Sequence, residues 1–192
     1  MLISETSIPT FGLELEDRGL EPHGHTARLV RLVESMGMML NVDSDGIETL
    51  IQAAYLHDIG KLLLPARVLL KASQLDPAEW SLVRTHARWS CEIARAIPGV
   101  TERALETILY HHERWDGLGY PQQISGNAIP IEARILTVCD VYDTLLSKRP
   151  YSRAWTTQAT LEEIQIRRGK HFDPKIVDAF LERALGKLTV SG

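Results

Sequence analysis

The sequence has few cysteines and no Cys-x-x-Cys spacing, since only Cys91 and Cys139 occur and they lie far apart. Neither a disulfide framework nor a thiolate zinc site is indicated, and we interpret both thiols as buried and free. Long apolar runs are also missing, because charged residues interrupt them well short of the roughly 18 residues that a membrane span needs. No basic-then-apolar leader with a small-residue cleavage site opens the chain. We therefore expect a cytoplasmic protein with no membrane span.

The chain also lacks an excess of basic residues. It has 21 Lys and Arg against 25 Asp and Glu, with a formal net charge of −4. Binding to polymeric nucleic acid is not expected, because it requires a basic surface that displaces counterions. A local basic pocket for a small anion is compatible with this charge. With 192 residues, 44% hydrophobic and 24% charged, the composition is that of a globular protein with one main domain.

No stretch alternates polar and apolar residues over a useful strand length, whereas apolar residues recur at three- and four-residue steps from His25 onward. The clearest helix start is Asp76-Pro77-Ala78-Glu79, which supplies an N-cap, a proline at the first helical position and a capping-box glutamate. Residues 1–20 show no clear period, so we interpret them as an N-terminal arm or linker before a domain that spans 21–192. The pattern predicts an all-α bundle of roughly seven helices.

Histidines and aspartates stand on or beside the expected inner faces of several helices. Burying such a group is costly unless it is hydrogen-bonded or bound to metal, and a single one is more often a satisfied core histidine. Seven at once are poorly explained as independent accidents, and helical bundles build metal sites from side chains on facing helices. Imidazole-rich, mixed nitrogen and oxygen ligation suits Fe, Mn or Zn better than Mg. The candidates are His25, His57, Asp58, His86, His111, His112 and Asp140.

The run His111-His112-Glu113-Arg114-Trp115-Asp116-Gly117-Leu118-Gly119-Tyr120-Pro121 resembles the signature of the HD-GYP subfamily of bacterial cyclic di-GMP phosphodiesterases. This subfamily is part of the HD phosphohydrolase superfamily. The resemblance continues through His57-Asp58-Ile59-Gly60-Lys61 and Gly169-Lys170-His171-Phe172-Asp173-Pro174, and covers the chain from about His25 to Leu185. It implies an HD-domain helical bundle with a metal site in its core.

By that resemblance all seven candidates bind two divalent transition-metal ions, Fe or Mn, and Asp58 is the carboxylate that bridges them. Glu21 matches a glutamate that holds a third ion in some members. Its position before Pro22 and Gly24 is equally suited to a helix N-cap or a partner of the helix dipole. The sequence leaves two ions and three ions open.

The implied activity is hydrolysis of cyclic di-GMP in bacterial second-messenger signalling, by a water that bridges two ions and has a lowered pKa. Lys61 and Arg149 match family positions that contact substrate phosphate, and both cations suit that task. Where the family often has a further basic residue this chain has Ser152, so either Arg153 substitutes or the substrate is held less tightly. We assign Tyr120, which presents an aromatic face in a tight Gly-Tyr-Pro turn, to substrate binding.

Two other hypotheses stay open. The first is hydrolysis of another nucleotide, such as a mixed cyclic dinucleotide, a 3′-phosphorylated alarmone or a linear dinucleotide. The second is a non-catalytic module that senses a cyclic dinucleotide or recruits a partner. By resemblance, the Gly119-Tyr120-Pro121 region is a candidate contact for GGDEF-type cyclase domains. The product, pGpG or GMP, a homodimer and a preceding sensory or receiver domain are left open.

Overall fold

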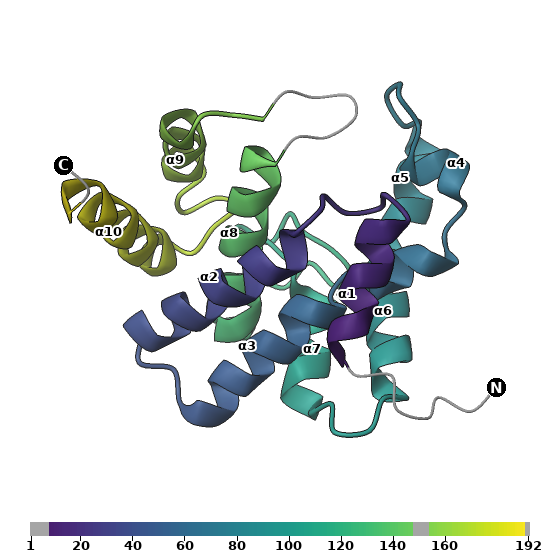
Figure 1. Cartoon of the computed structure of the whole chain (residues 1–192), viewed down its shortest axis with the longest axis horizontal. Coiled ribbons are helices and arrows are strands. Elements are labelled where there is room, and N and C mark those ends of the chain that lie inside the picture. The colour runs from purple at the N-terminus through teal and green to yellow at the C-terminus, as the bar shows by residue number, and fades with distance from the viewer. Residues whose placement is uncertain (1–7, 148–153, 191–192) are drawn as a thin grey trace.

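The computed structural model describes residues 8–147 and 154–190, and these residues form helices joined by loops, with no strand among them (Figure 1). The all-α prediction is therefore confirmed. No helix in this part of the chain is both long and apolar enough to cross a bilayer. The elements are α1 (Ile8–Asp17), α2 (His25–Met39), α3 (Ser44–Leu56), the 3-10 helix η1 (Ile59–Leu63), α4 (Ala66–Leu69), α5 (Pro77–Arg84), α6 (His86–Arg95), α7 (Glu102–Tyr110), the 3-10 helix η2 (Gly126–Ala128), α8 (Ile131–Leu146), α9 (Thr157–Ile166) and α10 (Pro174–Val190).

The core lies where α2, α3, α7 and α8 pack together, with α6 against η1 and α7. The apolar stripes predicted from three- and four-residue spacing supply it, and Leu29, Leu50, Ile108 and Leu136 are fully buried. Burial of such a side chain stabilises the fold by about 1.5–3 kcal/mol. The same packing brings the inner faces of these helices together, including their polar positions.

Local capping explains where several helices begin. The Asp43 side chain accepts a hydrogen bond from the backbone N–H of Gly46 at the start of α3. At α5, Asp76 and Glu79 form the predicted capping box, with Asp76 accepting from the Glu79 backbone at 2.8 Å. These side chains satisfy backbone donors that the first helical turn leaves without an intrahelical partner.

The helix that the sequence predicts to begin at Pro77 is interrupted. It breaks at Thr85, so α5 ends and α6 begins at His86. Apolar spacing predicts that Trp89 shares the inner face of this helix with His86, but Trp89 is 47% exposed and the neighbouring Ser90 is buried instead. Breaks and short helices of this kind raise the number of helical segments above the roughly seven predicted.

Residues 8–17, which the sequence predicts as part of an arm, form α1, and this helix packs against α3 and η1. The buried Glu16 carboxylate accepts hydrogen bonds from the backbone N–H groups of Gly24 at 2.6 Å and Thr26 at 3.0 Å. It therefore caps the first turn of α2, where Gly24 has no side chain to do so. Because the cap comes from another helix, no local pattern revealed it. The domain boundary after residue 20 stays a prediction.

Candidate metal centre

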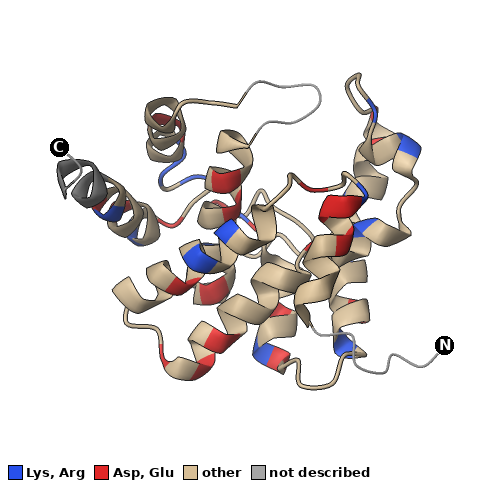
Figure 2. Ribbon diagram, in the orientation of Figure 1, with Lys and Arg blue, Asp and Glu red and all other residues tan. Residues whose placement is uncertain are grey.

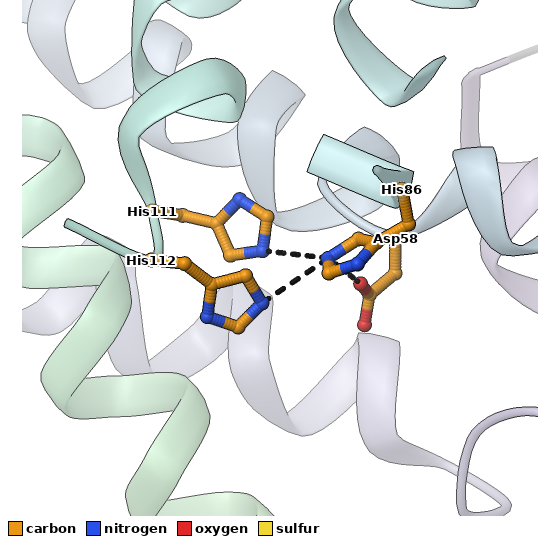
Figure 3. A group of neighbouring side chains, drawn as sticks. All are labelled: Asp58, His86, His111 and His112. Atoms are coloured by element: carbon orange, nitrogen blue, oxygen red, sulfur yellow. Dashed lines mark hydrogen bonds and ion pairs between the residues drawn. The ribbon is translucent and has the colours of Figure 1, made fainter. Parts of the chain in front are cut away.

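The seven candidate ligands meet inside the bundle in two groups, and within each group one ligand atom per residue lies within 4.8 Å of the others. The side chains come from the first turn of α2, the end of α3, the start of α6, the end of α7 and the middle of α8. Five are buried, and His112 and Asp140 are half-buried. The first group is Asp58, His86, His111 and His112 (Figure 3), and the second is His25, His57 and Asp140.

Asp58 lies between the two groups. Its Oδ1 is 3.1 Å from Nε2 of His86, and its Oδ2 is 3.2 Å from Nε2 of His57. Nε2 of His86 is also 3.4 Å from Nε2 of His111 and 3.1 Å from Nε2 of His112, and Figure 3 shows the three rings turned toward one another. One carboxylate thus faces both groups, which is the arrangement that a bridging ligand requires.

Backbone carbonyls orient three of the histidine rings. Nδ1 of His57, His86 and His111 lies 3.2, 2.7 and 2.6 Å from the carbonyl oxygen three residues earlier in the chain. A carbonyl can only accept, so each Nδ1 carries a hydrogen and Nε2 is the nitrogen that faces the cluster. Metal-binding histidines are commonly held in this way. Each ring is oriented in this way because the carbonyl three residues earlier lies in the preceding turn of the chain, within reach of Nδ1.

A carboxylate orients the His25 ring instead. Nδ1 of His25 lies 2.8 Å from Oδ2 of Asp143, and its Nε2 is 3.6 Å from Oδ1 of Asp140. Arg28 holds Asp143 from the other side through Nε at 2.6 Å and a terminal nitrogen at 2.9 Å. The sequence did not predict these roles of Asp143 and Arg28. The three-residue spacing of Asp143 from Asp140 on one helix was the available signal.

The electrostatics of the cluster keep His111 and His112 neutral and Asp58 ionised, and they favour a protonated His57. Burial alone would lower the pKa of His57, but the carboxylate of Asp58 outweighs it and raises this pKa to about 9. Burial and the neighbouring His57 hold the pKa of His111 well below its ordinary value, and burial does the same for His112. Burial opposes the charge on Asp58, yet Lys61 and His57 hold its pKa well below the usual range.

The residues present fit divalent metal ions. Nε2 of His25, Nε2 of His57 and Oδ1 of Asp58 are buried atoms that make no hydrogen bond within the described part of the chain. Buried polar atoms without partners are rare in folded proteins and are costly. Here they converge, and they belong to imidazole and carboxylate groups that ligate first-row transition metals. The clustered histidines and aspartates therefore suit divalent metal binding.

Lys61 and Glu21 form an ion pair at the edge of the first group. Nζ of Lys61 lies 2.7 Å from Oδ2 of Asp58 and also contacts Oε1 of Glu21. Burial raises the pKa of Glu21, while the Asp58 and Glu21 carboxylates outweigh the effect of burial on Lys61 and raise its pKa. Glu21 belongs to neither group of candidate ligands. The structure thus brings this glutamate to the lysine, and its role as a ligand of a third ion stays a prediction.

Tyr120 lies beside the first group. Its ring stacks on that of His112, with ring centroids 4.7 Å apart and planes inclined by 29°, and the Arg84 guanidinium lies 5.4 Å from its centroid. A glycine in a tight Gly-Tyr-Pro turn predicts an unusual φ, but the φ of Gly119 is not positive. A Cβ at this position would lie 2.6 Å from the carbonyl oxygen of His112, so close backbone packing is what requires glycine.

Glu113 anchors the loop that carries Tyr120. The buried Glu113 side chain accepts hydrogen bonds through Oε1 from the backbone N–H groups of Gln122 at 2.6 Å and Gln123 at 2.9 Å. Glu113 lies within the signature run, but the sequence did not predict this anchoring role. Arg149 and Arg153, the expected substrate contacts, lie outside the described residues, as does Ser152.

Comparison with known proteins finds a matching family and several similar proteins. The family model described as "HD domain" matches residues 13–176. The chain is 41% identical over 177 residues to the cyclic di-GMP phosphodiesterase response regulator RpfG of Xanthomonas campestris, covering 88% of this chain and 44% of that protein. It is 39% identical over 173 residues to the cyclic di-GMP phosphodiesterase of Thermotoga maritima, covering 87% and 46%.

A third relative carries a different substrate in its name. The 3'3'-cGAMP-specific phosphodiesterase 2 of Vibrio cholerae is 35% identical over 169 residues, covering 88% of this chain and 32% of that protein. The chain thus spans less than half of the length of each of these relatives. Among solved structures, the cyclic GMP-AMP phosphodiesterase V-cGAP3 of V. cholerae matches with a TM-score of 0.71 at 21% identity, covering 94% of this chain and 50% of that one. This likeness shows a shared fold.

Proposed function

This chain belongs to the HD domain family, and we propose that it is a metal-dependent phosphodiesterase that hydrolyses cyclic di-GMP. The observation that carries the proposal is the convergence of seven imidazole and carboxylate side chains in two groups, with the Asp58 carboxylate facing both. Two-metal sites of this kind catalyse the displacement of phosphate esters. The names of the relatives with 41% and 39% identity support the cyclic di-GMP assignment.

Two divalent ions, Fe or Mn, would stabilise charge on the phosphoryl oxygens and lower the pKa of a bound water. His86, His111 and His112 would hold one ion, and His25, His57 and Asp140 would hold the other. Asp58 would belong to both sets through its two oxygens. The Nδ1 hydrogen bonds orient the rings of His57, His86 and His111 beforehand, so little reorganisation of these rings is needed when the ions bind.

Lys61 is the residue of this chain that we propose for direct contact with a substrate phosphate. Its ammonium lies 2.7 Å from Asp58 and its side chain is 17% exposed, so it faces both the candidate centre and the solvent. A cation at this point can stabilise negative charge that develops on a non-bridging phosphate oxygen. We propose that Glu21 holds Lys61 in place and that the protein binds two ions, not three.

Tyr120 offers the bases of the substrate an aromatic face, because its half-buried ring lies at the edge of the first group, stacked on His112. Arg149 and Arg153 remain proposed contacts for the phosphates. The partnership with GGDEF-type cyclase domains through Gly119-Tyr120-Pro121, a homodimer and the cytoplasmic location stay predictions.

The mixed cyclic dinucleotide 3′3′-cGAMP is the second candidate substrate. The similarity to the V. cholerae enzyme named for it favours this alternative at 35% identity. The discriminating experiment purifies the chain without oxygen, measures its metal content and incubates it with each cyclic dinucleotide at equal concentration. We expect faster turnover of cyclic di-GMP, and no hydrolysis by an Asp58→Ala variant. Full metal occupancy without turnover of either compound would contradict the enzyme and favour the non-catalytic binding module.

A further inference from the structure

A pocket that does not include the candidate metal ligands lies between α2, α8 and α10. Its volume is about 700 Å³, which is within the range typical of small-molecule sites. None of the seven candidate ligands lines it, so it is not the space into which their donor atoms converge. Its walls are formed by Pro22, His23, Arg28, Arg31, Leu32, Tyr142, Asp143, Leu146, Ser147 and Arg183.

The pocket is basic in a chain whose net charge is negative. Three arginines line it against a single carboxylate, Asp143, and Figure 2 shows basic positions on both α2 and α10. Arg28 already neutralises Asp143 through two hydrogen bonds. The charges of Arg31 and Arg183 are therefore in excess within the pocket, and they favour an anionic ligand.

The two arginines in excess are held from opposite helices. Nε of Arg31 donates to the carbonyl oxygen of Ala27 at 3.1 Å, and Nε of Arg183 on α10 donates to Oγ of Ser35 on α2 at 2.8 Å. Each guanidinium has terminal N–H donors besides Nε. Within the described part of the chain neither forms an ion pair with a carboxylate, unlike Arg168, which pairs with Asp178 at 2.7 Å. Two oriented guanidinium forks suit the oxygens of a phosphate group.

An apolar side completes the pocket. Leu32 from α2 and Tyr142 and Leu146 from α8 line it together with the arginines. Phosphate alone would leave these side chains without a partner, whereas a ligand with a flat ring would cover them. We propose that this pocket binds a phosphate-bearing small molecule of about mononucleotide size, at a site separate from the metal centre.

The pocket and the candidate centre share one residue. Asp143 lines the pocket, and its Oδ2 also orients the ring of His25. The pairing of Arg28 with Asp143 keeps that carboxylate from repelling an anion in the pocket. Variants of Arg31 and Arg183 leave this pairing intact, so they test the pocket without altering the contact to His25.

The test is calorimetric titration of the full chain with GMP as the probe. We expect the Arg31→Ala/Arg183→Ala double variant to bind GMP at least about tenfold more weakly than the unchanged chain, because two charge-assisted hydrogen-bond donors are lost. The control is Arg67→Ala, which removes one positive charge from an exposed position on α4 and should bind within about twofold of the unchanged chain. Lys61→Ala, at the metal centre, should also retain this binding event.

Unchanged affinity in the double variant overturns the proposal. Loss of the binding event in Lys61→Ala overturns it too, because GMP would then be binding at the metal centre. Inorganic phosphate should bind more weakly than GMP; equal affinity would contradict the role of the apolar side. Photo-crosslinking with an azido derivative of GMP provides a second measurement, and we expect labelled peptides from α2 or α8 that disappear in the double variant.

Discussion

Nδ1 of His25 lies 2.8 Å from Oδ2 of Asp143, a pairing between two residues 118 positions apart that turns Nε2 of His25 toward Asp140. Asp143 is itself held by Arg28. Partners of this kind fix the orientation of a metal-binding ring and increase its basicity. The second ligand group therefore depends on a carboxylate that belongs to neither group of candidate ligands.

Replacing Asp143 tests this dependence. We expect Asp143→Asn to weaken binding of one of the two ions by about 10–100-fold, the usual effect of losing such a partner. Titration of Mn²⁺ into metal-free protein should resolve the weakened site. Asp45→Asn is the control, because it removes a carboxylate exposed on the first turn of α3. Equal affinities in Asp143→Asn and the unchanged chain would show that His25 needs no such support.

Gly60 packs so closely against α6 that we expect any larger residue at this position to destabilise the fold. A Cβ at this position would lie 2.6 Å from the backbone nitrogen of Ser90, whose hydroxyl accepts a hydrogen bond from the Gly60 N–H at 2.8 Å. We expect Gly60→Ala to destabilise the fold by about 1–3 kcal/mol through overpacking. Urea denaturation provides the measurement. Gly99→Ala, where an added Cβ meets nothing within 4 Å, reports the cost of its positive φ alone and should be milder.

Removal of the Glu21 carboxylate distinguishes the two roles of this residue. If Glu21 orients Lys61, Glu21→Ala keeps two ions per chain and lowers the turnover of cyclic di-GMP by about tenfold, because the lysine loses a partner. Elemental analysis and a hydrolysis assay on one preparation measure both quantities. Glu106→Ala is the control, since it removes an exposed carboxylate of α7. A loss of one ion in Glu21→Ala would establish a third metal site.

His171 should make stability depend on pH. Burial and the neighbouring Arg114 and Arg167 lower its pKa from 6.5 to about 4. Between these two pH values His171 is protonated in the unfolded chain but neutral in the folded chain. The contribution of neutral His171 to the unfolding free energy is therefore complete above pH 6.5 and is lost as the pH falls toward 4. We expect His171→Gln to reduce the pH dependence of the unfolding free energy in this window by roughly 1–2 kcal/mol. Parallel curves for the two proteins would contradict this.

The positions of the candidate ligands were predictable because each follows a local rule. His25 continues the apolar stripe of α2, which includes Leu29 and Val33, and His86 stands at an inner position of its helix. Once helical periodicity turns these side chains inward, packing of the helices brings them together. The signature from His111 to Pro121 added the family and the bridging role of Asp58.

The supporting contacts were not predictable in the same way, because they join residues that are distant in the sequence. The pairs Lys61–Glu21 and Arg28–Asp143 span 40 and 115 positions, and no periodicity relates their members. The cap that Glu16 provides to α2 depends on where α1 packs. These contacts are set by the tertiary arrangement, which is why the sequence predicted the ligands but not the distant side chains that orient His25 and Lys61.

The central claim is that the two groups hold two ions with Asp58 between them. Crystals of anaerobically prepared protein, measured with X-rays above and below the Fe and Mn absorption edges, test it directly. We predict two anomalous peaks, one within bonding distance of His86, His111 and His112, the other within bonding distance of His25, His57 and Asp140, with an oxygen of Asp58 on each. A single peak, or peaks that do not contact Asp58, would contradict the two-ion centre.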